Sequence, residues 1–127
     1  MNLKDYFDNV KGIGVLSTSN DKGEVDSAIY ATPHVFDDTT VGFIMRDRLS
    51  YQNITSNPKA CYLFVENSLG YNGKRLYLTK VKEEKNSEQL MQLRRRHSDY
   101  DPSKENLFLV TFNVDQALPL ICKEDLC

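Results

Sequence analysis

Two arginines and a serine follow an apolar segment near the middle of the chain. In "GFIMRDRLS", residues 42–50, the apolar run passes directly to Arg46 and Arg48, and Ser50 stands where a helix could begin. Guanidinium groups, a hydroxyl and the unpaired amides of a helix's first turn all favour an anion, and phosphate fits such a group of donors well. The spacing therefore predicts an anion site at this junction.

The same residues also allow a purely structural interpretation. Arg46 and Arg48 could form ion pairs with Asp47 or with other surface carboxylates, and such exposed pairs contribute little. Ser50 could then serve only as the N-cap of the following helix. Taken alone, these residues leave both interpretations open.

The other chemically capable side chains form no catalytic or metal-binding motif. His34 and His97 are the only histidines, and neither has a metal-ligand spacing to another histidine or to a cysteine, so we expect no metal site. No serine stands in a G-x-S-x-G motif, and the sequence identifies no catalytic residue. We interpret His34 as a strand side chain and Arg94 to Arg96 as a solvated helix face. The sequence assigns no role to Cys122 or Cys127.

The elements that must position the anion site are short and mostly extended. Apolar residues at helical spacing predict a helix over residues 2–11, and two more helices are predicted over 50–57 and 86–100, the last with Asn86 as its N-cap. Pro33 implies an edge, bend or bulge in the strand that contains it. Strands are predicted over residues 13–19, 24–36, 41–46, 59–66, 74–84 and 106–114, with a short extension over 117–122.

Strands in this order, joined by short turns and small helices, predict a mainly β fold. We expect a single domain over residues 1–127 that forms an antiparallel six-stranded β-barrel. The length of 127 residues suits one hydrophobic core.

Composition narrows the function classes. The net charge of −2 does not favour a nucleic-acid partner, and no apolar run is long enough to span a membrane. The charged N-terminal segment does not resemble a signal peptide, and the three cysteines include no C-x-x-C pair. We therefore expect a cytoplasmic protein.

The order of motifs over residues 13–66 resembles a known family. "GVLSTSNDKGEVDSAIYATPHVFDDTTVGFIMRDRLSYQNITSNPKACYLFVE" contains a G-x-L-x-T strand, an N-D-K-G turn, two further strands, the arginine after the last of them, and a helix that ends at N-P. This order is similar to that of the pyridoxamine 5'-phosphate oxidase-like, FMN-binding split-barrel superfamily. The resemblance implies a split barrel that forms a homodimer with FMN at the interface.

The resemblance also implies which residues would contact FMN. The phosphate side would comprise Arg46, Arg48, Ser50 and Tyr51, with Gln52 and Asn53 beside them. The ring side would comprise Ala28, Ile29 and Tyr30 of the second strand and Phe43, Ile44 and Met45 of the third.

The implied function is that of a small FMN-dependent oxidoreductase acting on a small molecule. One alternative is a non-catalytic module that holds FMN, heme or a deazaflavin for storage, sensing or electron transfer, and another is a cofactor-free barrel. Many family members carry a basic residue where this chain has Ser50 and Tyr51. The C-terminal substrate-binding pattern of the true pyridoxamine phosphate oxidases is not found, so that activity is not expected.

Overall fold

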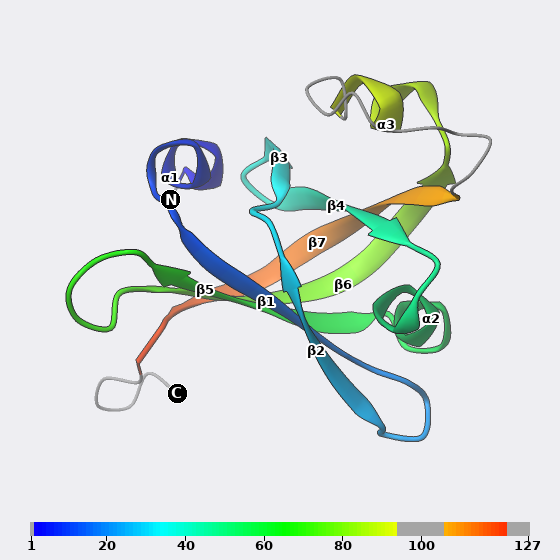
Figure 1. Cartoon of the computed structure of the whole chain (residues 1–127), viewed down its shortest axis with the longest axis horizontal. Coiled ribbons are helices and arrows are strands. Elements are labelled where there is room, and N and C mark those ends of the chain that lie inside the picture. Colours follow the sequence, from blue (N-terminus) through cyan, green and yellow to red (C-terminus); the bar gives the residue numbers. More distant parts are fainter. Residues whose placement is uncertain (1, 94–105, 122–127) are drawn as a thin grey trace.

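The computed structural model describes residues 2–93 and 106–121 (Figure 1). Arg94 to Arg96, His97, Cys122 and Cys127 lie outside the described residues, so the interpretation of Arg94 to Arg96 as a solvated helix face stays a prediction. The elements are α1 Leu3–Asn9, β1 Gly12–Ser19, β2 Val25–Tyr30, β3 His34–Asp37, β4 Thr40–Arg46, α2 Leu49–Ser56, β5 Lys59–Glu66, β6 Gly73–Lys85, α3 Glu88–Leu93 and β7 Leu107–Pro119.

The described strands form one antiparallel sheet that curls around the core without closing. The strand order is β2-β1-β5-β6-β7-β4-β3, so β2 and β3 are its two edges. The prediction of a mainly β, antiparallel split barrel is confirmed. Among the described helices, none is long and apolar enough to cross a membrane.

The described sheet has seven strands rather than the six predicted, because the predicted strand over 24–36 is divided. Its first part, β2, pairs with β1, whereas its second part, β3, pairs with β4 at the opposite edge of the sheet. Pro33 lies in the link between them, where its missing N–H interrupts no ladder. The link carries the chain from one edge of the sheet to the other, and β4 therefore follows β2 only after this crossing (Figure 1).

Aromatic side chains fill much of the core. Phe7 of α1 packs edge-on against Phe64 of β5, with ring centroids 5.3 Å apart, and Phe43 of β4 contacts Tyr62 and Phe112 at 5.0 and 6.0 Å. A second cluster lies beneath α3, where buried Leu90, Leu107 and Leu109 pack with Ile44 and Leu93. The core thus fixes β4, which carries part of the predicted anion site.

The interpretation of Ser50 as the N-cap of the helix, one of the two left open by the sequence, is wrong. Helix α2 begins at Leu49, its N-cap is Arg48, and the Arg48 side chain makes no capping hydrogen bond. Ser50 lies inside the first turn, and its hydroxyl instead donates a hydrogen bond of 3.1 Å to Oδ2 of Asp26 on β2. This contact ties the start of α2 to the edge strand.

The N-cap prediction for Asn86 is also wrong. Asn86 has a positive φ of 46°, and its side-chain oxygen accepts a hydrogen bond from the Leu107 amide. The capping role falls to Ser87, whose hydroxyl accepts from the Leu90 amide at 3.1 Å. Asparagine tolerates the left-handed conformation, so Asn86 suits the tight turn before the helix.

Candidate functional site

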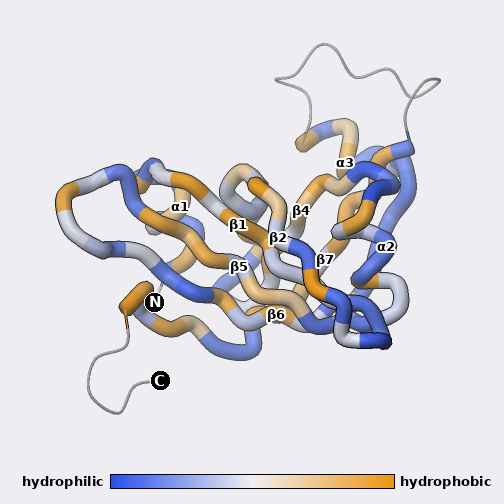
Figure 2. The backbone as a smooth tube through the Cα atoms, turned by 60° about the horizontal axis from the view of Figure 1, so that its bottom comes forward, coloured by the Kyte–Doolittle hydropathy of each residue, from blue (hydrophilic) through white to orange (hydrophobic). Residues whose placement is uncertain are grey.

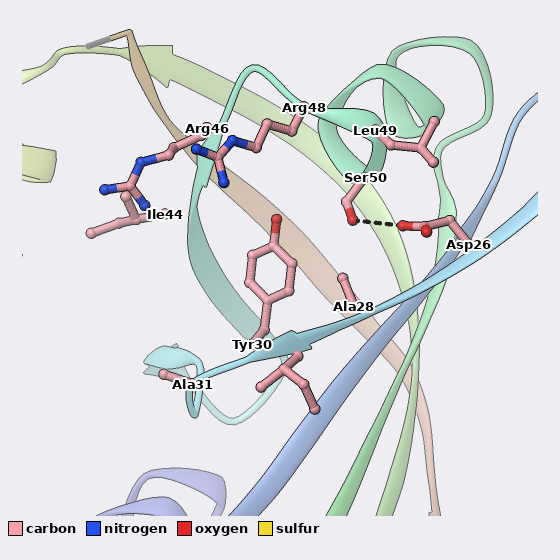
Figure 3. Close-up of a pocket in the computed structure, with 10 residues that line it drawn as sticks. Asp26, Ala28, Tyr30, Ala31, Ile44, Arg46, Arg48, Leu49 and Ser50 are labelled. Carbon is pink, nitrogen blue, oxygen red and sulfur yellow. Dashed lines mark hydrogen bonds between the residues drawn. The ribbon is translucent and has the colours of Figure 1, made fainter. Parts of the chain in front are cut away.

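A cavity of about 460 Å³ opens where β2, the end of β4 and the start of α2 meet (Figure 3). Strand β2 contributes one wall of the cavity and α2 another. The hydrogen bond between Ser50 and Asp26 joins these two walls. The residues that line it are Asp26, Ala28, Ile29, Tyr30, Ala31, Ile44, Arg46, Arg48, Leu49 and Ser50.

Most of the residues predicted for the site line this cavity, from both the phosphate side and the ring side. They are Ala28, Ile29, Tyr30, Ile44, Arg46, Arg48 and Ser50. Phe43 lines an adjoining cavity, whereas Met45 is fully buried in the core. The assignment of these residues as cofactor ligands stays a prediction.

The three remaining predicted residues lie on other faces of α2. The Tyr51 ring stacks on Phe108 with centroids 4.0 Å apart, and its hydroxyl donates to Glu83. The Asn53 amide donates to the Thr18 hydroxyl at 3.1 Å, and Gln52 is exposed. A helix turns by one residue in 3.6, so four successive residues cannot face one cavity.

The cationic side of the cavity is formed by Arg46 and Arg48. Both are exposed residues, and the Arg48 amide donates to the Arg46 carbonyl at 2.8 Å in the tight turn between β4 and α2. Figure 3 shows both side chains on the same side of the cavity. Two guanidinium groups so placed can bind one anion together.

Tyr30 lies between the cationic side and α2. Its ring packs edge-on against Phe43 at 5.9 Å, and its hydroxyl points into the cavity (Figure 3). Burial raises the pKa of the Tyr30 hydroxyl, an effect that the Ser50 hydroxyl and the two arginines oppose and the Asp26 carboxylate supports. Tyr30 therefore stays neutral near pH 7 and can donate or accept a hydrogen bond.

Asp26, Ala31 and Leu49 line the cavity but were not predicted. Asp26 could have been found from strand alternation, because Asp26, Ala28 and Tyr30 fall on the same face of β2. Leu49 begins α2 and Ala31 follows β2, and neither has a sequence signal that marks it as a site residue.

A second cavity of about 170 Å³ adjoins the first. The two share Tyr30, Ala31 and Ile44 as walls. The other lining residues are Thr32, His34, Phe43 and Leu93, so this cavity is mostly apolar. Together the two cavities present a cationic end and an apolar end.

Within residues 2–93 and 106–121, no group of three or more His, Cys, Asp or Glu side chains could hold a metal ion.

Comparison with solved structures identifies the fold. No family model and no curated protein sequence matches the chain. An FMN-binding protein from Syntrophomonas wolfei matches with a TM-score of 0.73 at 18% identity, over 93% of this chain and 83% of that one. HupZ of Group A Streptococcus matches with a TM-score of 0.74 at 19% identity, over 93% and 90% of the two chains.

A third similar structure is that of HutZ, the heme storage protein of Vibrio cholerae. It matches with a TM-score of 0.69 at 13% identity, over 92% of this chain and 91% of that one. Likeness at these identities establishes the fold, whereas a ligand must be argued from the site itself. As the motif order over residues 13–66 predicted, the chain has the split-barrel fold of the FMN-binding, pyridoxamine 5'-phosphate oxidase-like proteins.

Proposed function

We propose that this protein binds FMN in the two adjoining cavities and acts as a small FMN-dependent oxidoreductase. The observation that carries the proposal is the pairing of a cavity bearing Arg46 and Arg48 with an apolar cavity behind a shared wall. FMN has the matching pair of ends, a phosphate and a flat, largely apolar ring. The fold is one in which FMN-binding proteins occur.

The residues present fit such a cofactor in charge and size. Arg46 and Arg48 would hold the phosphate through charge-assisted hydrogen bonds, and Tyr30, Phe43 and Ile44 would line the ring. The larger cavity, at about 460 Å³, lies within the usual range of roughly 300–1,000 Å³ for small-molecule and cofactor sites.

Bound FMN would supply hydride or electron transfer, and this chain would bind, orient and shield it. Tyr30 offers a neutral hydroxyl at the junction of the two cavities, and Ile44 presents an apolar side chain to both. No side chain of the site has to act as a strong base. The proposed substrate is a small molecule that the flavin reduces or oxidises.

A visible absorption spectrum of freshly purified protein tests the cofactor. We expect a flavin spectrum, FMN in the supernatant after denaturation, and bleaching of the flavin by NADH or NADPH. Protein that stays colourless after incubation with FMN would refute the proposal.

A second candidate function is a non-catalytic module that holds heme, a deazaflavin or FMN. The observation that favours it is the likeness to the heme storage protein HutZ. This candidate predicts a bound chromophore with no turnover by NADH or NADPH, and a heme spectrum would favour it directly.

We further propose that two copies of the chain form a homodimer that shares the cofactor site. The outward face of β1, β2 and β5 carries exposed apolar side chains, among them Ile13 at 61%, Val25 at 82% and Ile29 at 72% exposure. Figure 2 shows hydrophobic stretches along neighbouring β1 and β5. Ile29 also lines the larger cavity, so a partner on this face would lie beside the cofactor.

A further inference from the structure

We infer that Asp26 makes the larger cavity selective for a ligand that carries hydroxyl groups beside its anionic end, over a ligand whose polar groups are carboxylates. A ribityl chain belongs to the first class and heme to the second. The inference rests on the proposed function, because it names what the same cavity admits. It concerns a residue that neither the motif order nor the fold singles out.

The cavity has two poles of opposite charge. Arg46 and Arg48 lie on one side, and Asp26 lies across the cavity on β2, with Tyr30 between them (Figure 3). Within the part of the chain that the structure describes, no ion pair joins Asp26 to either arginine. The charge of Asp26 is therefore not cancelled by the cations of the same cavity.

The Asp26 carboxylate is held in place by its surroundings. Its strand residue pairs with Thr18 of β1, and its Oδ2 accepts a hydrogen bond of 3.1 Å from the Ser50 hydroxyl. Ser50 is only 5% exposed and belongs to α2, so the contact is anchored in two elements. Ser50 is the sole hydrogen-bonding side-chain partner of Asp26 among the described residues, which leaves acceptor capacity on the carboxylate.

A carboxylate in this position discriminates between ligand groups by charge. It can only accept hydrogen bonds when ionised, so it attracts hydroxyl or amino donors and repels carboxylates. Asp26 is half-buried, and the reduced screening there strengthens both effects relative to open water. A ligand with an anion at the arginine end and hydroxyls near Asp26 satisfies both poles, whereas the propionates of heme would meet repulsion at one of them.

The test compares riboflavin and hemin as probes in equilibrium titrations of cofactor-stripped full-length protein. Riboflavin has the ribityl hydroxyls without the phosphate, so its binding isolates the Asp26 pole from the arginine pole. The variants are Asp26→Asn, Asp26→Glu and, as a matched control in the exposed turn before β2, Asp21→Asn. Thermal melting of each variant verifies folding, and Asp26→Ser replaces Asp26→Asn if the latter melts early.

We expect the wild-type protein to bind riboflavin more tightly than hemin. Asp26→Asn should shift the ratio of the two dissociation constants at least tenfold toward hemin, because the amide still accepts a hydrogen bond but no longer repels carboxylates. Asp26→Glu and Asp21→Asn should leave the ratio within threefold of the wild type.

Three outcomes would count against the inference, and they separate it from the proposed function. Wild-type protein that binds flavin, with a ratio unmoved by Asp26→Asn, would overturn the role of Asp26 alone. A wild-type preference for hemin would overturn that role and favour the second candidate function. Protein that binds neither riboflavin nor FMN would overturn both proposals.

Discussion

Arg46 and Arg48 lie close together because the chain makes a tight turn between β4 and α2. The Arg48 amide donates to the Arg46 carbonyl at 2.8 Å, so the two side chains leave the backbone from neighbouring points. Exposed ion pairs contribute little to stability, but two guanidinium groups that line one cavity can both donate hydrogen bonds to one phosphate. Their shared contribution should therefore appear in the binding of an anion.

Replacement of either arginine should weaken the binding of a ligand that has a phosphate and leave the binding of a ligand without one unchanged. We expect Arg46→Ala and Arg48→Ala each to weaken FMN binding by about 1.5–3 kcal/mol, the usual size of a charged hydrogen bond. Riboflavin, which has no phosphate, should bind each variant as it binds the wild type, and Lys22→Ala in an exposed turn should change neither affinity. Fluorescence titration measures both ligands. Unchanged FMN affinity in a variant would remove that arginine from the site.

The strand end that carries Tyr30 is anchored from the core. The Tyr62 hydroxyl, on a ring with 0% exposure, donates to the carbonyls of Tyr30 and Ala31 at 3.2 and 3.0 Å. Gly14 makes room for this contact, since a Cβ there would lie 1.8 Å from the Tyr62 hydroxyl oxygen. Tyr62 thus fixes the point at which β2 leaves the sheet beside both cavities.

Removing the Tyr62 hydroxyl should loosen that strand end. We expect Tyr62→Phe to lower the free energy of unfolding by about 1–3 kcal/mol, because it removes the one hydroxyl hydrogen that the two carbonyls share while it preserves the ring. FMN binding should weaken as Tyr30 becomes less well positioned. Urea denaturation and FMN titration measure the two effects, and Tyr71→Phe, on a residue with 80% exposure, is the control. Wild-type values in both measurements would contradict the anchoring role.

Helix α2 is tied to β6 by a group that responds to pH. The Glu83 carboxylate accepts hydrogen bonds from the Tyr51 hydroxyl and from the Lys80 ammonium. Partial burial opposes the ionisation of Glu83, but the contacts with Lys80 and Tyr51 outweigh it and hold its pKa below the usual range. A carboxylate with a lowered pKa stabilises the fold above its unfolded-state pKa, and this stabilisation is lost as the pH falls through its folded-state pKa.

The pH dependence of Glu83→Gln should reflect that sign. We expect the variant to be less stable than the wild type near pH 7, with the difference shrinking as the pH falls below about 4, the ordinary glutamate range. Glu84→Gln is the matched control, because the Glu84 carboxylate lies 3.9 Å from the Lys82 ammonium in a looser pair. Thermal or urea denaturation across this pH range measures the difference. A deficit that is constant with pH would exclude the ionised carboxylate as its cause.

The elements differ in how far the sequence specified them. Strand β5, predicted over residues 59–66, has those bounds in the structure because Asn57-Pro58 ends the preceding helix and the apolar run is continuous. Alternation indicates which side chains share a face of a strand, but it does not indicate which strand lies next to it. The predicted strand over 24–36 is divided because β3 pairs with β4, and this pairing of two strands is not indicated by the alternation within either of them.

The candidate site shows the same limit. Arg46 and Arg48 follow directly from the chain order, whereas the cavity needs α2 to return to β2 through the contact of Ser50 with Asp26. Sequence order placed Tyr51 and Asn53 beside the arginines, but the helix turns them toward Phe108 and Thr18. Local spacing found the charges, and tertiary packing determined which neighbours complete the site.

At the scale of the whole molecule, the sheet has one face in the core, and the outward face of β1, β2 and β5 carries exposed apolar side chains. Leu16 of β1 and Tyr62 of β5 point into the core. Ile13 and Val65 lie on the opposite face of the same two strands and are 61% and 36% exposed. Together with Val25 and Ile29 of β2 they form what we term the outer apolar face. Exposed apolar side chains gathered on one face favour the proposed contact with a second copy of the chain.

A charge introduced on the outer apolar face should dissociate the dimer and, as a consequence, lower the affinity for FMN. We expect Ile13→Glu to shift the protein from dimer to monomer in light scattering, because a buried unpaired carboxylate is strongly unfavourable at an interface. Ile13 does not line either cavity described above, so a loss of FMN affinity in this variant would have to pass through the dimer. Leu69→Glu, on a residue with 98% exposure outside the face, should remain dimeric.

In the wild type, FMN should in turn stabilise the dimer by linkage. On dilution, the dimer should therefore dissociate at a higher protein concentration when FMN is absent than when it is present. A monomeric Ile13→Glu variant that binds FMN at full strength would show that one chain builds the whole site.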